Sequence, residues 1–313
     1  MIGCDGRRRV ERSGSNVTFG TLRVALLVVA LLGGLVGCGS SGSDSSPLEP
    51  PTTSIPANAS EARFPADRIV WQARTTGGLV PQVAWASQRP SLTIYGDGRY
   101  FATSPGLDRR YDQPIQMRTG TVSRDDLAVF VAGAEASGLF ERGVEFGKPA
   151  VADMPFTTIR LHGNGPELKI SAYALGGRFD VDLSDEEVLE RETLRRLLAT
   201  AEGLVANPKP WTPSRIRVLR LPDDATFDPK PGADPEAESV EWPGPPLDEI
   251  DEPAPVGHGS TDVLGCTEVT GSEAASLFSA AVENPLPRWN VDGTDRTIVV
   301  VALLPDEAAC GKA

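Results

Sequence analysis

Two histidines, His162 and His258, are the candidate general bases in this 313-residue chain. His258 lies in Gly257-His258-Gly259-Ser260, where the serine hydroxyl is a possible nucleophile. A hydrolase triad also requires an orienting carboxylate, and the sequence has no G-x-S-x-G elbow. His162 precedes a Gly-Asn-Gly turn, where a solvated or locally bonded histidine is the expected state. No catalytic residue is therefore assigned, and His258 with Ser260 is the one pairing worth testing.

Acidic side chains offer oxygen ligands, but their spacing does not fit a metal site. Residues 180–184 begin like a calcium-binding loop, with oxygens at its first, third and fifth positions. Asp185 then stands where such a loop needs glycine, and Arg191 stands where it needs a bidentate glutamate. The stretch predicts instead a polar lead-in to a capped helix. Since cysteine and histidine show no zinc-like spacing either, we expect no metal and no cofactor.

Glycine motifs and aromatic side chains give no specific ligand. No P-loop pattern occurs, and the single G-x-G-x-x-G match, residues 37–42, follows no strand of a βαβ unit. Aromatic residues that could line a sugar or peptide groove are Trp71, Trp85, Tyr95 and Tyr100. Because aromatic residues in strands mostly pack in a core, we expect these four to be core residues.

Cys38 has the clearest chemical assignment in the chain. It ends Leu35-Val36-Gly37-Cys38, which resembles the lipobox of bacterial lipoproteins, and arginines precede the apolar run 24–37. This run is shorter than the roughly 20 residues of a membrane-spanning helix and has the length of a signal-peptide core. The resemblance implies that Cys38 becomes the mature N-terminus and carries two acyl chains such as palmitate. The alternative is a signal peptide whose cysteine is incidental.

Two further cysteines predict a disulfide. Cys4 leaves with the signal peptide and lipid occupies Cys38, so Cys266 and Cys310 remain. An even pair in an exported chain favours a bond between them. The closed loop of about 45 residues corresponds to a stabilisation on the order of 4 kcal/mol in the chain-entropy description.

The charge of the chain restricts its partners. Asp and Glu number 43 against 30 Lys and Arg, a formal net charge of −13. Residues 1–37 contain five arginines and only two carboxylates, so the rest of the chain is more acidic still. Such a surface repels nucleic acid and anionic head groups. We expect membrane contact through the lipid on Cys38, an unknown envelope protein or small ligand as partner, and no nucleic acid.

Composition divides the chain into five segments: a lipoprotein signal peptide 1–37, a flexible tether 38–66, an α+β domain 67–221, an acidic proline-rich loop 222–257, and a disulfide-closed subdomain 258–313 docked on the same body. The tether is rich in Ser, Pro, Thr and Ala and has few large apolar residues, which is typical of a linker. The acidic loop shows too little periodicity to predict regular structure.

Hairpins and helices alternate in the remaining sequence. Glycine-rich turns at 96–98 and 163–165 each separate two strand-like runs. Each hairpin precedes a helix, one capped by Ser123 and one with a capping box from Ser184 to Glu187. The predicted fold class is α+β, an antiparallel sheet of β-hairpins with two to three packed helices. The spacing of 67 residues between the two turns suggests a duplicated hairpin-helix unit.

Four short motifs give the chain a family resemblance. They are Trp71-Gln72-Ala73-Arg74, Gly77-Gly78, Tyr95-Gly96-Asp97-Gly98, and Leu303-Leu304-Pro305-Asp306-Glu307 before Cys310. With them the chain resembles a group of uncharacterised actinobacterial lipoproteins, which implies a location and an architecture but no catalytic residues.

The expected function is a binding or interaction module, lipid-anchored on the extracytoplasmic face of the cell membrane, and we lean against an enzyme. The alternative is an envelope-associated hydrolase acting on glycan or peptide, with His258 or loop carboxylates as its catalytic groups.

Overall fold

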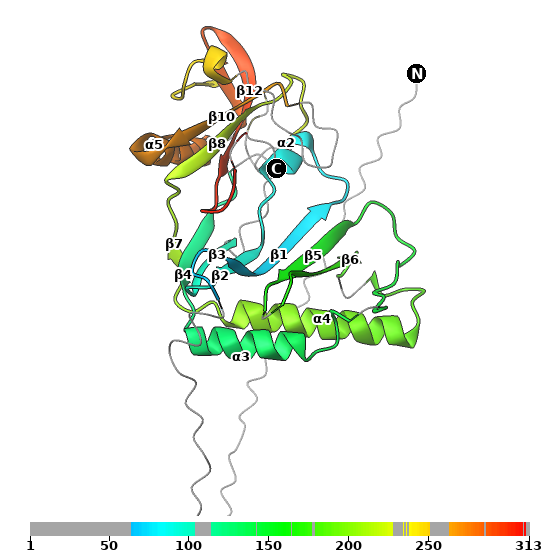
Figure 1. Ribbon diagram of the computed structural model, residues 1–313. Helices are drawn as coiled ribbons and strands as arrows, with labels where there is room; N and C mark the ends of the chain where they lie inside the picture. The colour runs from blue at the N-terminus through cyan, green and yellow to red at the C-terminus, as the bar shows by residue number, and fades with distance from the viewer. Residues whose placement is uncertain are drawn as a thin grey trace, which may run out of the picture. The chain divides into compact units, whose positions relative to one another are not determined.

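Two sheets with helices packed on them form the part of the chain that the computed structural model describes (Figure 1). The described residues are 64–103, 114–141, 143–163, 165–176, 179–227, 234, 236, 238–250, 263–284, 286–308 and 310. The predicted signal peptide, Cys38, most of the tether, and the pair His258 and Ser260 lie outside these ranges. The fold class is α+β, as the sequence predicts.

The first sheet is antiparallel throughout and has β1 near its centre. Its strands, in spatial order, are β6 (Leu168–Tyr173), β5 (Pro155–Leu161), β1 (Ile69–Gly77), β2 (Leu92–Tyr95), β3 (Arg99–Thr103), β4 (Met117–Thr121) and β7 (Lys209–Pro210). The predicted hairpins β2–β3 and β5–β6 both form, and they flank β1 on opposite sides. Common origin of the two hairpin-helix units stays a prediction.

The turn between β2 and β3 depends on glycine. Gly98 has φ +88°, a left-handed conformation that disfavours residues with a side chain. A Cβ atom at this position would also lie 2.2 Å from the carbonyl oxygen of Val122. Asp97 completes the turn, because its Oδ1 accepts a hydrogen bond of 2.9 Å from the backbone N–H of Arg99.

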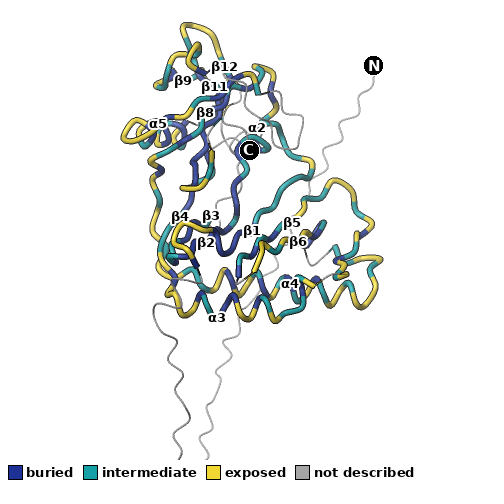
Figure 2. Tube along the Cα trace, in the orientation of Figure 1, coloured by how far each residue is buried: buried dark blue, intermediate teal, exposed yellow. Residues whose placement is uncertain are grey.

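Two helices cover one face of the first sheet (Figure 2). They are α3 (Arg124–Glu135) and α4 (Asp185–Gly203), and both begin at the predicted serine caps. Ser184 and Glu187 form the expected capping box, with hydrogen bonds of 3.2 Å and 2.7 Å. The buried stripes of both helices pack on strand residues such as Trp71, whose ring meets Phe130 edge-on at 5.0 Å. Burial of these apolar stripes holds the helices on the sheet.

The second sheet has its own core. Its strands, in spatial order, are β10 (Gly265–Thr270), β8 (Arg215–Arg220), β12 (Thr294–Ala302), β11 (Arg288–Val291) and β9 (Val240–Glu241), with only β9 and β11 parallel. Helix α5 (Gly271–Glu283) packs on one face, and the short helix α2 (Gln82–Ser87) contributes Val83 to the apolar cluster on the other. A 3₁₀ helix, η2 (Leu247–Ile250), precedes β10.

Two details of this sheet differ from the sequence expectation. Strand β8, which the pattern places in the segment 67–221, pairs with β10 and β12 of the second sheet. The acidic stretch 222–257 contributes β9 and buries Trp242 against Trp289, with ring centroids 5.0 Å apart. Burial of this tryptophan ring anchors β9 and its neighbours, within a stretch whose proline-rich composition predicts only a loop. None of the helices in the described ranges has the length and apolarity that a membrane span requires.

A buried arginine joins α4 to the edge of the first sheet. Arg191 is fully buried, and its guanidinium donates to the carboxylate of Asp180 at 2.6 Å and to backbone carbonyls of Phe146 and Tyr173. Arg195 donates to the other carboxylate oxygen of Asp180. Burial by itself would raise the pKa of Asp180, but the hydrogen bonds from Arg195 and Arg191 outweigh it and lower the pKa. Asp180, the first residue of the calcium-like stretch 180–184, thus belongs to an ion-pair network.

Asp180→Asn should destabilise the protein by about 3 kcal/mol at pH 7, because it leaves the buried Arg191 guanidinium without a counter-charge. The folded-state pKa of Asp180 is depressed, so its stabilisation is present above the unfolded pKa and is lost as pH falls through the folded value. The difference in free energy of unfolding between wild type and variant, measured by urea titration, should therefore narrow below about pH 4. Asp182→Asn, an exposed neighbour, is the control. A gap that persists unchanged at pH 2 would contradict this account.

Candidate functional site

The chain leaves β12 and crosses to the face of the first sheet opposite α3 and α4. Leu304 of this C-terminal segment, residues 303–307, is fully buried there in a cluster with Tyr95, Phe101 and Met117. Side chains alternate between the faces of a strand, so the residues next to the helix-facing Trp71, Ala73 and Ile94 point to this side. Gln72, Arg74 and Thr93 therefore share the face with Tyr95. The segment carries its two carboxylates onto that face.

Both carboxylates of the C-terminal segment bind residues of the first sheet. Asp306 accepts a hydrogen bond from the phenol of Tyr95 on β2. Glu307 Oε1 lies 3.5 Å from Nη2 of Arg74 on β1. Its Oε2 accepts from Nη2 of Arg89, in the loop after α2, and from the backbone N–H of Leu304 at 2.9 Å. One carboxylate thus connects a strand, a loop and its own segment.

The two arginines at Glu307 differ in exposure. The Arg89 side chain is 2% exposed, whereas Arg74 is 36% exposed and Glu307 is 19% exposed. A guanidinium as buried as that of Arg89 requires a counter-charge, since its desolvation is costly. Glu307 supplies that charge from 218 positions further along the chain. We name the group Arg74, Arg89 and Glu307 the arginine–carboxylate cluster.

The surroundings of the cluster change its proton affinities. Burial lowers the pKa of Arg74, the nearby Arg89 cation lowers it further, and Glu307 acts in the opposite direction. Burial and the Arg89 cation also lower the pKa of Arg217 on β8, and Glu307 acts in the opposite direction. A third guanidinium therefore lies within electrostatic range of the cluster. Burial and the hydrogen bond to Asp306 raise the pKa of Tyr95, which keeps its phenol a donor at neutral pH.

Two donor groups of the cluster lack an acceptor within the described part of the chain. They are the Nε–H groups of Arg74 and Arg89, both buried. An unsatisfied buried donor costs about 1–3 kcal/mol. The cluster therefore has hydrogen-bonding capacity that Glu307 does not use.

Arg215 of β8 secures the outer side of the C-terminal segment. Its guanidinium donates to the backbone carbonyl of Glu307 at 3.2 Å and to the Glu268 carboxylate of β10 at 2.5 Å. The backbone of Arg215 also accepts from the N–H of Leu303 at 3.0 Å. The segment is thus held by side chains of both sheets.

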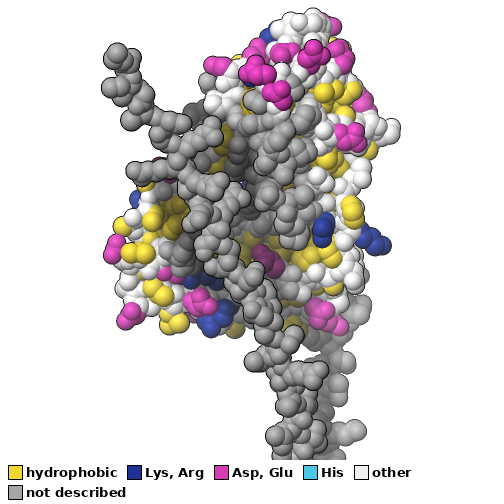
Figure 3. All heavy atoms as spheres, turned by 180° about the vertical axis from the view of Figure 1, so that it is seen from behind, with side chains coloured by type: hydrophobic (Ala, Val, Ile, Leu, Met, Phe, Trp, Pro, Cys, Tyr) yellow, Lys and Arg dark blue, Asp and Glu magenta, His cyan; other side chains and the backbone are white. Residues whose placement is uncertain are grey.

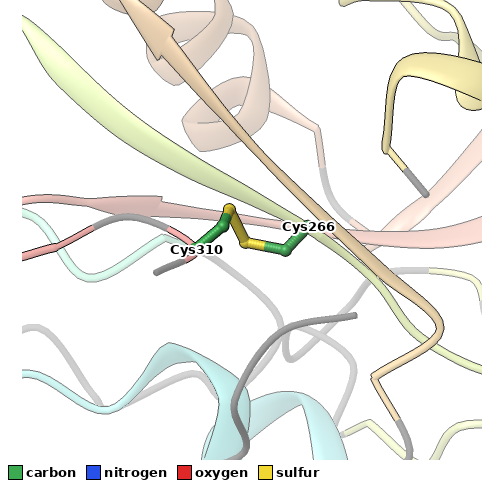
Figure 4. Close-up of a disulfide and its surroundings, with 2 residues drawn as sticks. All are labelled: Cys266 and Cys310. Atoms are coloured by element: carbon green, nitrogen blue, oxygen red, sulfur yellow. A yellow bond between two sulfur atoms is a disulfide. The ribbon is translucent and has the colours of Figure 1, made fainter. Parts of the chain in front are cut away.

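The other end of this segment reaches the predicted disulfide. Cys266 of β10 and Cys310 lie at disulfide distance, with Cα atoms 5.7 Å apart (Figure 4). The pair that the sequence predicts is therefore brought together. Its sulfur atoms lie beside the apolar cluster that α2 forms with Leu219 and Val301.

The predicted candidates for catalysis do not meet in the described residues. His162 Nδ1 lies 2.8 Å from the carbonyl of Ile69 and 3.1 Å from Nε of Arg68, and its Nε2 lies 2.8 Å from Glu167. No serine, threonine or cysteine is among those neighbours. His258 and Ser260 lie outside the described part. Within that part, no group of three or more His, Cys, Asp or Glu side chains could hold a metal ion.

The four candidate aromatic residues do not form a groove together. Trp71 and Tyr100 are buried on the helix side of the first sheet, and Tyr100 donates to the carbonyl of Ala206 at 2.9 Å. Tyr95 is buried on the opposite face, and Trp85 of α2 is half-buried. The expectation that strand aromatics pack in the core holds for these three strand residues.

Acidic side chains dominate another part of the surface. On the face shown in Figure 3, Asp and Glu side chains gather at the end of the molecule that carries the second sheet. Exposed carboxylates of this sheet and its turns include Glu241, Asp292 and Asp295. This acidic surface is consistent with the net charge of the chain.

Sequence reasoning assigned no function to any member of this site, and Arg89 and Arg217 also lie outside the motifs that it singled out. Their partners lie over 80 residues away in the chain, so no local pattern reveals them. A partial signal exists, since the motifs that carry the family resemblance contain Arg74, Tyr95, Asp306 and Glu307, and these residues contact one another. Comparison with protein-family models, with curated proteins and with solved structures found no match to this chain.

Glu307→Gln should destabilise the fold by about 2–4 kcal/mol, because the buried Arg89 guanidinium loses its counter-charge while the shape of the side chain is kept. The measurement is the free energy of unfolding from urea titration at pH 7. Glu241→Gln removes an exposed charge of the second sheet and should change stability by less than about 0.5 kcal/mol. Equal stabilities of the two variants would show that the cluster does not hold the C-terminal segment.

Cys266→Ser should lower stability by on the order of 3–4 kcal/mol, because it reopens a loop with a sequence separation of 44 residues. A reducing agent should lower the melting temperature of wild type to that of the variant. It should leave the melting temperature of Cys266→Ser unchanged, which serves as the internal control. An unshifted wild-type melt under reduction would mean that the bond does not stabilise the native state.

Proposed function

We propose that this chain is a lipid-anchored extracytoplasmic protein of the cell envelope that acts as a binding or interaction module. The observation that carries the proposal is the order of features in the sequence: arginines, the apolar run 24–37, Leu35-Val36-Gly37-Cys38, and a Gly/Ser-rich stretch. A predicted tether of residues 38–66 would connect the lipid on Cys38 to the folded body. A disulfide between Cys266 and Cys310 is consistent with an oxidising compartment.

The chemistry of the arginine–carboxylate cluster favours binding over catalysis. Guanidinium groups donate hydrogen bonds and stay protonated near neutral pH, so Arg74 and Arg89 bind anions rather than transfer protons. The phenol of Tyr95 is held as a donor to Asp306. No observation on the described residues favours the alternative hydrolase, whose groups His258 and Ser260 lie outside them.

Membership of the uncharacterised actinobacterial lipoprotein group remains part of this proposal. Support comes from the contacts among its motifs, since Arg74 of the first motif meets Glu307 of the last and Tyr95 meets Asp306. Motifs that are distant in sequence would then be retained together because each supplies one half of a contact. The proposed partners are the membrane, through the lipid, and an envelope protein or small ligand at the cluster.

Cys38→Ala tests the anchor. Wild type grown with labelled palmitate should incorporate label, and mass spectrometry should place its mature N-terminus at Cys38. The variant should lose the label, because the thiol that accepts lipid is gone, and should keep the length of the precursor. Cys4→Ala, a cysteine of the predicted signal peptide, should be labelled like wild type. Labelled Cys38→Ala protein, or a wild-type N-terminus elsewhere, would refute the anchor.

A further inference from the structure

Two members of the arginine–carboxylate cluster are partly exposed to solvent. Arg89 is almost completely enclosed, but a third of the Arg74 side chain and a fifth of the Glu307 side chain remain exposed. Arg74 is therefore the more accessible of the two arginines. A small group is favoured over a large one, since the deeper arginine is 2% exposed.

The unused donors of the cluster specify which group would fit. The Nε–H groups of Arg74 and Arg89 are buried and have no acceptor among the described residues. Glu307 engages only one terminal nitrogen of each arginine. A guanidinium presents its donors in a planar fork, which matches the paired oxygens of carboxylate, phosphate and sulfate groups. An anion with at least two acceptor oxygens would satisfy both donors.

The charges of the cluster point to the same class of ligand. Two guanidiniums share the single carboxylate of Glu307, and the cation of Arg217 lies within electrostatic range of all three groups. Asp306, the neighbouring carboxylate, is hydrogen-bonded to Tyr95. With three guanidiniums set against the carboxylates of Glu307 and Asp306, this partly enclosed site attracts a further anion more strongly than the acidic surface of the second sheet does.

We propose that Arg74 and Arg89 form a binding site for a small ligand that carries an oxyanion group, and that Glu307 is the internal group with which this ligand shares or competes for the site. This inference names a ligand class for the proposed binding module and rests on that proposal. It does not depend on the lipid, so palmitate labelling and ligand titration can fail separately.

Glu307 competes with an external anion for the two arginines. Its carboxylate is held near the arginines by the chain itself, at a high effective concentration. A ligand must either add at the free Nε–H groups or displace this carboxylate. Neutralising Glu307 removes this competitor, and it also removes a negative charge that repels the anionic ligand. The change should therefore strengthen ligand binding even though it weakens the fold.

Calorimetric titration of the full mature chain, purified in detergent, tests the site. The probes are sodium acetate, phosphate and sulfate, with sodium chloride at matched ionic strength as reference. Wild type should bind at least one oxyanion saturably. Glu307→Gln should bind it about tenfold more tightly and Arg74→Gln at least about tenfold more weakly. Arg196→Gln, an exposed position on α4, should match wild type.

The outcomes separate the sources of the oxyanion. Binding of acetate alone would indicate a carboxylate ligand, and binding of phosphate or sulfate alone a tetrahedral one. If neither wild type nor Glu307→Gln binds any probe beyond chloride, the proposal is overturned, and wild type supplies this answer even if a variant fails to fold. Binding that Arg74→Gln leaves unchanged, in a variant with a cooperative melt, would equally overturn it.

Discussion

The buried guanidinium of Arg89 imposes the constraint on which the arrangement of this chain depends. A charge that is 2% exposed must be compensated nearby, and the compensating carboxylate belongs to Glu307, 218 positions away. Meeting this requirement brings residues 303–307 from the end of β12 onto the open face of the first sheet. Beside this ion pair, Asp306 accepts a hydrogen bond from the phenol of Tyr95, and Leu304 packs into the apolar cluster that contains Tyr95. One electrostatic requirement thereby connects two sheets whose apolar cores are separate.

The disulfide and the arginine–carboxylate cluster act on the same segment by different physical means. The covalent bond at Cys310 limits how far the end of the chain can move in the unfolded state. The ion pairs at Glu307 select one position for it in the folded state. Arg215 links these two effects, because its guanidinium contacts the segment between them and the adjacent strand β10. The disulfide and the ion pairs together determine where the C-terminal segment lies and which charges it pairs with.

Local features of the fold follow from the sequence, whereas its long-range pairings do not. The turn at Gly98, the capped helices α3 and α4, and the disulfide rest on short-range signals or on counting cysteines, and the structure contains them. Which sheet β8 joins, and that Arg74 and Arg89 both meet Glu307, depend on which apolar faces and charges come together in the folded chain. Trp242 illustrates the difference, since a proline-rich stretch gives no periodicity but its tryptophan finds Trp289. Arginine positions show no spacing that would reveal a common destination.

Stability and ligand binding draw on the same atoms in this cluster. Each hydrogen bond that Glu307 makes to Arg74 or Arg89 holds the C-terminal segment and also occupies a donor that an external anion would need. A second internal carboxylate would satisfy the free Nε–H groups and increase stability, but it would abolish the capacity to bind. The chain instead leaves those two donors without an acceptor among its described residues and leaves Arg74 partly exposed. Unsatisfied buried donors are costly in a purely structural contact, whereas a binding site for an anion requires donors that are free to bind it.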